Sequence, residues 1–181
     1  MTEDKLVGEA RSIIARILPR RFEVERGAVL LYEVRLDDRL QVTVNPTQPT
    51  RGQSAFETDL CVFERRTANL RIPRVVLEFK PGLSSHDVLT YSTKARKHKQ
   101  VYPYLRYGLV VARHSAVPGR FYTHNEALDF CLAVKDLPAR TLADVLSRLL
   151  KKEIACSRCL QVMAFEPRTA RLFRNEVRLS L

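Results

Sequence analysis

The hydrophobic positions of this chain follow helical spacing in three segments and strand spacing between them. Apolar residues recur every three or four positions over 6–18, which predicts an amphipathic helix that Pro19 ends. A second helix is expected from Ser84 to about residue 103, and a third over 141–163. Asp87 stands three residues after Ser84, and this spacing is typical of a helix N-terminal cap.

Shorter apolar runs predict the strands. They lie at 29–36 and 40–44, which Asp37 and Asp38 would join as a hairpin, then at 56–63, 75–80, 107–112 and 128–134. Because the run at 107–112 follows a helix, we expect it to lie parallel to the strand before it. The whole chain therefore predicts one α/β domain over 1–181, with a mixed central sheet flanked by helices and a helical C-terminal part.

Candidate chemistry lies at the end of the apolar run 75–80, which closes with Glu78-Phe79-Lys80. Strand side chains alternate between two faces, so Glu78 and Lys80 project together and Phe79 projects the other way. Asp59 stands inside the run 56–63, and pairing of the two strands would bring it near Glu78. Two carboxylates can hold a hard cation such as Mg²⁺, while a lysine orients water or offsets charge on phosphate. This pattern predicts metal-dependent hydrolysis of a phosphodiester.

The charge of the chain suits a polyanionic partner. The formal net charge is +11, with 31 Lys and Arg against 20 Asp and Glu. The arginine groups are Arg16, Arg20, Arg21 and Arg26, then Arg65, Arg66, Arg71 and Arg74, and finally Arg168, Arg171, Arg174 and Arg178. DNA is the partner we expect, and a basic, well-solvated surface without a specific partner is the alternative.

Other classes of protein fit less well. No apolar stretch approaches the roughly 20 residues of a membrane helix, and the acidic N-terminus is unlike a secretory signal, so we expect a cytoplasmic location. Cys61 and Cys131 lie in apolar runs and are interpreted as core residues. Cys156 and Cys159 have the spacing of metal ligands, but no second pair follows them, so two cysteines on a helix is the favoured interpretation.

Asp59, followed by Glu78-Phe79-Lys80 at the end of a strand and then by a helix and a strand, resembles the PD-(D/E)XK nuclease superfamily. This superfamily includes restriction endonucleases and many repair and recombination nucleases. The resemblance covers about 6–112 and implies an αβββαβ restriction-endonuclease-like core, with about 113–181 as a C-terminal extension. It also implies that Asp59, Glu78 and the carbonyl oxygen of Phe79 bind Mg²⁺, with Mn²⁺ as a substitute, and that Lys80 contacts the attacking water or the phosphate.

Two further catalytic positions follow from the resemblance. Glu9 stands on the first helix, where many members carry an auxiliary acid, and Gln100 matches a glutamine on the helix after the E-x-K strand. Helical spacing independently places Lys94, Lys97 and His98 on a shared face. That face is expected to hold the DNA backbone, and a merely solvated helix face is the alternative.

The expected function is therefore a metal-dependent DNA endonuclease of the restriction or the repair and recombination type. One alternative is a non-catalytic nucleic-acid-binding module on the same fold, and another is a protein-interaction subunit whose residues 141–181 pack on a partner. Many enzymes of this type cut two strands as dimers, so a homodimer is compatible with the first hypothesis. No segment of the sequence identifies a dimer interface.

Overall fold

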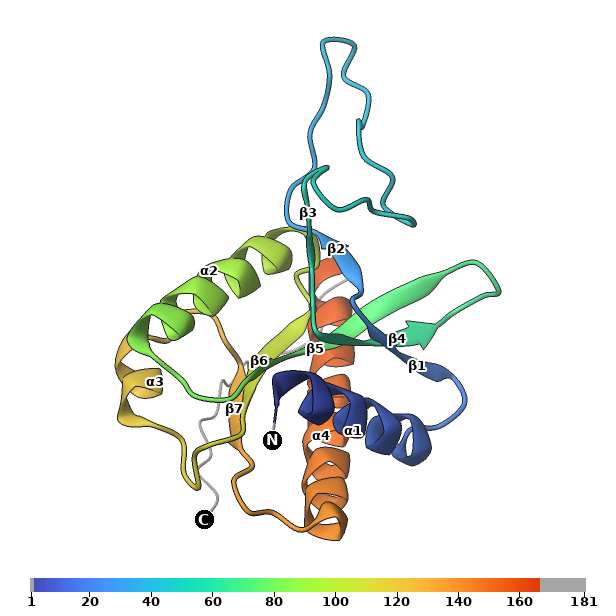
Figure 1. Ribbon diagram of the computed structural model, residues 1–181. Helices are drawn as coiled ribbons and strands as arrows, with labels where there is room; N and C mark the ends of the chain where they lie inside the picture. The colour runs from blue at the N-terminus through green and yellow to red at the C-terminus, as the bar shows by residue number, and fades with distance from the viewer. Residues whose placement is uncertain (1, 167–181) are drawn as a thin grey trace.

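The fold consists of a mixed five-stranded sheet between two helical layers, as the computed structural model shows for residues 2–166 (Figure 1). The helices are α1 (Glu3–Ile17), α2 (Ser85–Val101), α3 (Gly119–His124) and α4 (Ala139–Phe165). The strands are β1 (Phe22–Arg26), β2 (Val29–Leu31), β3 (Ala55–Glu57), β4 (Leu60–Arg65), β5 (Arg71–Lys80), β6 (Arg106–Val111) and β7 (Phe130–Ala133). The predicted α/β class, with a mixed central sheet flanked by helices and a C-terminal helix, is confirmed.

The central sheet has the order β1-β4-β5-β6-β7, while β2 and β3 form a separate antiparallel pair. β4 is antiparallel to both β1 and β5, and β6 is parallel to both β5 and β7. The expectation that the strand after α2 lies parallel to its predecessor is therefore correct. The antiparallel register pairs Leu60 with Leu77, and the same register places Asp59 opposite Glu78.

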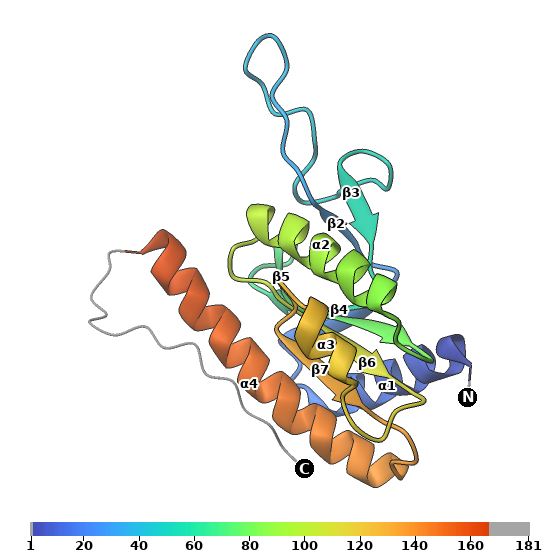
Figure 2. The same cartoon turned by 90° about the vertical axis from the view of Figure 1, so that its left-hand side faces the viewer.

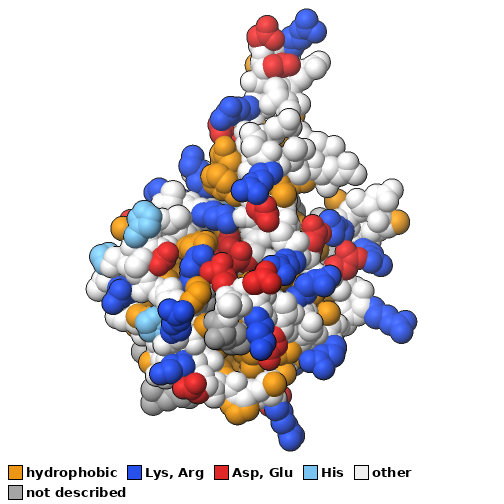
Figure 3. Space-filling model, in the orientation of Figure 1, with side chains coloured by type: hydrophobic (Ala, Val, Ile, Leu, Met, Phe, Trp, Pro, Cys, Tyr) orange, Lys and Arg blue, Asp and Glu red, His pale blue; other side chains and the backbone are white. Residues whose placement is uncertain are grey.

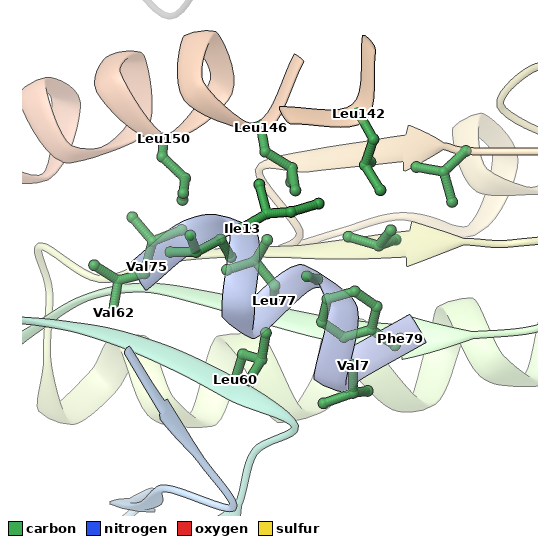
Figure 4. Packing of buried hydrophobic residues seen from close by; sticks show 14 of the residues in the cluster. Val7, Ile13, Leu60, Val62, Val75, Leu77, Phe79, Leu142, Leu146 and Leu150 are labelled. Atoms are coloured by element: carbon green, nitrogen blue, oxygen red, sulfur yellow. The ribbon is translucent and has the colours of Figure 1, made fainter. Parts of the chain in front are cut away.

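Helices α1 and α4 cover one face of the sheet, and α2 and α3 cover the other (Figures 1 and 2). Leu142, Leu146 and Leu150 of α4 pack toward the sheet beside α1, and Phe79 of β5 lies in the same cluster (Figure 4). Their four-residue spacing supplies the apolar stripe that the sequence predicted for this helix. The region after residue 112 thus belongs to the main core, because it supplies both β7 and the helix that covers the sheet.

The start of α2 follows the expected cap. The Ser84 side chain accepts a hydrogen bond from the Asp87 backbone N–H at 3.1 Å, and the Asp87 carboxylate accepts one from the Ser84 N–H at 2.7 Å. This reciprocal capping box satisfies backbone donors that no earlier helical carbonyl can reach. It sets the point at which the chain turns from β5 into α2, and so the position of α2 over the sheet.

Three predicted strands, those at 29–36, 40–44 and 56–63, differ in extent from the structure. The hairpin expected over 29–44 keeps only β2 as a strand, and residues 32–54 project from the body of the protein (Figures 1 and 2). The strand expected over 56–63 is interrupted at Thr58 and Asp59, so that β3 pairs with β2 while β4 joins the central sheet. The Thr58 hydroxyl donates to the carbonyl of Ala28 at 2.9 Å, which anchors the interruption. Asp59 therefore lies at the entrance to a strand and not in its middle.

β1 was not expected from the sequence. Its residues, Phe-Glu-Val-Glu-Arg, alternate between apolar and charged, and the strand forms an edge of the sheet with only partial burial. The hydrophobic signal of such a short edge strand is weak, because only one face packs on the core. Within residues 2–166, no helix is both long and apolar enough to cross a membrane.

Candidate functional site

An open cleft of about 530 Å³ lies where the N-terminus of α1 meets the interruption between β3 and β4. Its lining is rich in carboxylates and comprises Glu3, Asp4, Val7, Arg26, Gly27, Glu57, Thr58 and Asp59. Figure 3 shows acidic side chains gathered at the centre of this face, with lysine and arginine side chains around them. The cleft is therefore a concave, charged surface next to the carboxyl end of β5.

Asp59 lines this cleft and is in direct contact with the buried Glu78, as their strand positions predicted. The Asp59 backbone N–H donates to Oε2 of Glu78 at 3.3 Å, and Oδ2 of Asp59 accepts the backbone N–H of Phe79 at 2.7 Å. The interruption of the strand makes this possible, because β4 pairs with β5 only as far as Leu77. Beyond that point the carboxylate of Asp59 takes the place of a backbone partner.

Glu78 is buried, with 1% of its surface exposed, and its charge is compensated by α2. Oε1 of Glu78 accepts hydrogen bonds from Nζ of Lys94 at 2.6 Å and from the hydroxyl of Tyr107. Lys94 also donates to the backbone carbonyl of Glu57 at 2.6 Å. These donors hold the Glu78 side chain in one orientation, since a buried carboxylate without partners would be costly.

Lys80 lies at the end of β5 and pairs with an acid from α1. Its Nζ is 3.2 Å from Oε2 of Glu3 and 5.5 Å from the centre of the Tyr91 ring. Burial opposes the charge on Lys80, but the hydrogen bonds to Tyr91 and Glu3 outweigh it and raise the pKa of the lysine. The raised pKa favours the protonated, positively charged form of Lys80.

Asp59 is less well compensated than Glu78. Burial, together with the charge of Glu78, raises the pKa of Asp59 from 3.8 to about 6, although the Phe79 N–H works in the opposite direction. Within residues 2–166, no lysine or arginine forms an ion pair with Asp59, and its Oδ1 has no hydrogen-bond partner. The carboxylate of Asp59 is thus available to bind a cation.

The carbonyl of Phe79 is also placed for a ligand. In a strand, the N–H and C=O of one residue point to the same side, and the N–H of Phe79 points to Asp59. The carbonyl of the next residue, Lys80, accepts the N–H of Ala112 and so points toward β6. The Phe79 carbonyl is therefore directed toward the Asp59 side, past the last pair of β4 and β5.

Glu9 and Gln100 lie away from these groups. Six helical residues separate Glu9 from Glu3, which corresponds to about 9 Å along α1 and a third of a turn around it. Within the described residues Glu9 forms no ion pair, whereas Glu3 contacts Lys80. Gln100 is exposed and lines another cleft of about 460 Å³. The structure thus brings Glu3 and Lys94, rather than Glu9 and Gln100, to the two carboxylates.

The expected DNA-binding face of α2 is divided by the fold. Lys97 is exposed, but Lys94 is largely occupied by Glu78, and His98 has no exposed surface. One ring nitrogen of His98, Nδ1, lies 2.9 Å from the carbonyl of Leu31, and burial lowers the pKa of this imidazole to about 4. His98 therefore cannot contact phosphate, because α2 turns it into the core instead of toward solvent.

Some of the arginines expected at a DNA interface have partners within the protein. Arg65 and Arg71 form ion pairs with Glu23 of β1, and Arg74 is fully buried against Glu64 at 2.8 Å. The third group, at 168–178, lies outside the described residues. The basic surface is thus smaller than a count of arginines suggests.

The oxygen atoms at this site are ligands of the kind that a hard divalent cation prefers. Within residues 2–166 no group of three or more His, Cys, Asp or Glu side chains is arranged as a metal site, and Cys156 and Cys159 have no further ligand. Mg²⁺, however, commonly takes only one or two carboxylates and completes its shell with water and substrate phosphate. Asp59, Glu78 and the Phe79 carbonyl supply that kind of oxygen-rich, incomplete set.

Three contributors to the site were missed at the sequence level: Glu3, Tyr91 and Tyr107. Tyr91 precedes Lys94 by three positions on α2, so the helical spacing could have paired them. Glu3 and Tyr107 come from α1 and β6, and only long-range packing brings them in. No known family model matches this chain, and no curated protein matches it either.

Proposed function

We propose that this protein is a divalent-metal-dependent phosphodiesterase that acts as a DNA endonuclease. The observation that carries the proposal is that Asp59, which lines the cleft, is in direct contact with the buried Glu78, with Lys80 at the adjoining end of β5. The order α1, β1, β4, β5, α2, β6 also supports it, because it is the αβββαβ order that the resemblance to PD-(D/E)XK nucleases implies.

Asp59, Glu78 and the Phe79 carbonyl would hold Mg²⁺ or Mn²⁺. Such an ion polarises a phosphate and lowers the pKa of water, which is the chemistry that phosphodiester hydrolysis needs. Asp59 has to be ionised to serve as a ligand, so activity should fall below about pH 6 as this carboxyl takes up a proton. Lys94 and Tyr107 keep Glu78 oriented toward Asp59.

Lys80 acts as a fixed cation in this proposal. Its raised pKa keeps it protonated, so it can donate hydrogen bonds to the attacking water or to a phosphate oxygen. Glu3 restrains the long side chain and sets the direction of the ammonium group. The net charge of +11 favours approach of a polyanion to a protein whose cleft itself is acidic.

The test is cleavage of supercoiled plasmid with Mg²⁺, Mn²⁺ or EDTA, comparing the wild type with Glu78→Gln. Glu153→Gln is the matched control, since Glu153 is another glutamate with little exposed surface that pairs with a basic side chain, Arg106 at 2.6 Å, and it lies on α4 away from the cleft. We expect metal-dependent nicking or linearisation that Glu78→Gln loses and Glu153→Gln keeps. Equal cleavage by both variants would exclude Glu78 from the site.

A non-catalytic nucleic-acid-binding module is the second candidate. It is favoured by the ion pair of Lys94 with Glu78, because a carboxylate with this many donors can serve structure alone. This candidate predicts DNA binding that weakens steeply with salt, without metal-dependent turnover. A folded protein that shifts DNA in a gel but leaves every plasmid and linear substrate intact would support it.

A further inference from the structure

Residues 32–54, here called the arm, leave the body of the protein between β2 and β3 and project into solvent (Figures 1 and 2). Of the large hydrophobic side chains that are exposed in the described part of the chain, four of ten lie in this short segment. They are Val34, Leu36, Leu40 and Val42, with exposed fractions of 49%, 57%, 79% and 55%. Neither apolar core cluster includes a residue of the arm, so the exposed apolar side chains of the arm lie outside the core.

Two apolar side chains of the arm, Leu36 and Val42, share one face. Leu36 bridges Val42 across two antiparallel segments, and directly opposite residues project to the same side. The backbone bonds around the bridge run from the Thr43 N–H to the Arg35 carbonyl and from the Asp37 N–H to the Gln41 carbonyl. This makes Leu36 and Val42 a close, non-hydrogen-bonded pair. Val34 lies nearer the body and lines the cleft that Lys97, Gln100 and Val101 of α2 also line.

The turn at the end of the arm is held rigidly by its own side chain. Oδ1 of Asp37 accepts the backbone N–H groups of Arg39 at 2.8 Å and Gln41 at 2.9 Å. Between them, Leu40 adopts a left-handed backbone conformation with φ of 58°, which is unfavourable for a leucine. Leu40 thus places an exposed apolar side chain at the tip, where a smaller polar residue would suit the turn better.

The charges of the arm are balanced, unlike those of the rest of the chain. The arm contains three acidic residues (Glu33, Asp37 and Asp38) and three basic residues (Arg35, Arg39 and Arg51). Its net charge is therefore zero, in a chain of net charge +11. Two of the arginines are already occupied: Arg35 pairs with Glu33 at 3.0 Å and Arg51 with Glu57 at 2.9 Å. A segment built to bind phosphate would carry free cations instead. Two copies of a strongly basic protein, by contrast, repel each other least at a neutral surface.

We propose that the apolar face of the arm docks against the same face on a second copy of this chain. A flat apolar ribbon face is self-complementary under twofold rotation, so each protomer contributes the same side chains. Leu36 and Val42 lose contact with water in the pair, and Leu40 packs beyond them. Three side chains make a small interface, so we expect a dissociation constant of about 10–100 µM.

The pairing has a consequence that rests on the proposed function. Cutting both strands of a duplex needs two active sites, and the described residues hold a single Asp59–Glu78 contact per chain. A dimer joined by the arms would bring two such sites to one duplex. The disruption of the dimer should therefore change the product from linear to nicked plasmid without abolishing hydrolysis.

The experiment is sedimentation velocity without DNA or metal, from about 5 to 200 µM protein, on the full chain. The test variant is Leu36→Asp with Val42→Asp, and the control is Gln41→Asp with Thr43→Asp, which adds the same charge to the opposite face of the ribbon. Circular dichroism and melting temperature should match the wild type for both, since the arm lies outside the core. We expect the wild type and the control to rise from the 20.8 kDa monomer toward twice that mass, while the test variant remains monomeric.

A wild type that stays at 20.8 kDa over the whole range overturns the proposal, as does a test variant that dimerises like the control. If the wild type is monomeric and the test variant alone loses affinity for duplex DNA, the arm binds DNA and not a second copy. The mass measurement involves no cleavage, so it decides the pairing even if the protein proves to have no nuclease activity. Conversely, plasmid cleavage by a purely monomeric protein would retain the proposed function and reject the dimer.

Discussion

Two aspartates, Asp59 and Asp129, occupy similar positions in the sheet but differ in the charges around them. Each stands just before a strand and accepts a backbone N–H of the neighbouring strand at 2.7 Å, from Phe79 and Tyr107 respectively. Asp129 also forms ion pairs with Lys99 at 2.7 Å and Arg106 at 2.8 Å. Asp59 has Glu78 as its neighbour instead, and its pKa rises to about 6.

The two sites also lie at opposite ends of the parallel strands. Asp129 sits at the amino ends of β6 and β7, whereas Asp59 lies beside the carboxyl end of β5, where ligands bind in open α/β sheets. At both ends an aspartate accepts a backbone N–H of the neighbouring strand. At one end this aspartate belongs to an ion-pair network, and at the other it lines an acidic cleft. The comparison teaches that a carboxylate signals function when its charge is left uncompensated, and not merely when it is buried.

The largest expected effect is on cleavage. Asp59→Asn keeps an acceptor for the Phe79 N–H but removes the charge of the proposed metal ligand. The activation free energy should therefore rise by several kcal/mol, which lowers the rate at least roughly 1,000-fold. Asp129→Asn should leave the rate of the folded protein within a few fold. Plasmid cleavage at matched folded concentration measures both. Similar losses in the two variants would remove the distinction between the sites.

The next largest effect is on stability, and here Asp129→Asn should be more harmful than Asp59→Asn. Asp129→Asn leaves Lys99 and Arg106 without their shared carboxylate in a partly buried network, which should cost about 2–4 kcal/mol of unfolding free energy. Urea unfolding followed by circular dichroism gives this value at pH 8. A cost below roughly 0.5 kcal/mol would mean that the network is solvated and contributes no more than a surface ion pair.

Asp59→Asn should instead stabilise the protein, and only at high pH. The pKa of Asp59 is about 6 in the folded protein against 3.8 as its ordinary value, so the folded state binds the proton more tightly. Wild-type stability therefore decreases as the pH rises from about 4 to 6, by up to about 3 kcal/mol. Asparagine does not ionise, so the variant should match the wild type near pH 4 and exceed it at pH 8. Urea unfolding at both pH values checks this, and equal stabilities at pH 8 would contradict it.

The smallest effect sharpens the role of Lys94. Its ammonium group and a divalent cation would compete for Glu78, so Lys94→Gln should bind Mg²⁺ or Mn²⁺ more tightly than the wild type. With 10 mM metal, the melting temperature should rise by a few degrees more in this variant, which corresponds to about 1 kcal/mol. Lys97→Gln, an exposed lysine on the same helix, is the control. Identical metal-induced shifts in both variants would show that Lys94 and the cation do not share Glu78.

Sequence patterns anticipated the parts of the site that depend on local geometry. Strand alternation was sufficient to place Glu78 and Lys80 together, and strand pairing was sufficient to place Asp59 opposite Glu78. The cap at Ser84 followed from a spacing of three residues. The alternation rule failed to show that the strand is interrupted at Asp59, because the interruption is set by bonds to the distant chain at Gly27 and Ala28.

The amino-acid sequence by itself determined the three longer helices and most central strands of this protein, together with the acidic pair, because these depend on periodicities of two to four residues. The short helix α3 was not predicted. Tertiary structure alone decided that Glu3 meets Lys80, 77 residues away, and that Lys94 turns to Glu78 while His98 turns inward. It also decided that residues 32–54 project as an arm with an exposed apolar face. Such outcomes depend on how helices settle on a sheet, where burial and charge compensation between distant segments outweigh local pattern.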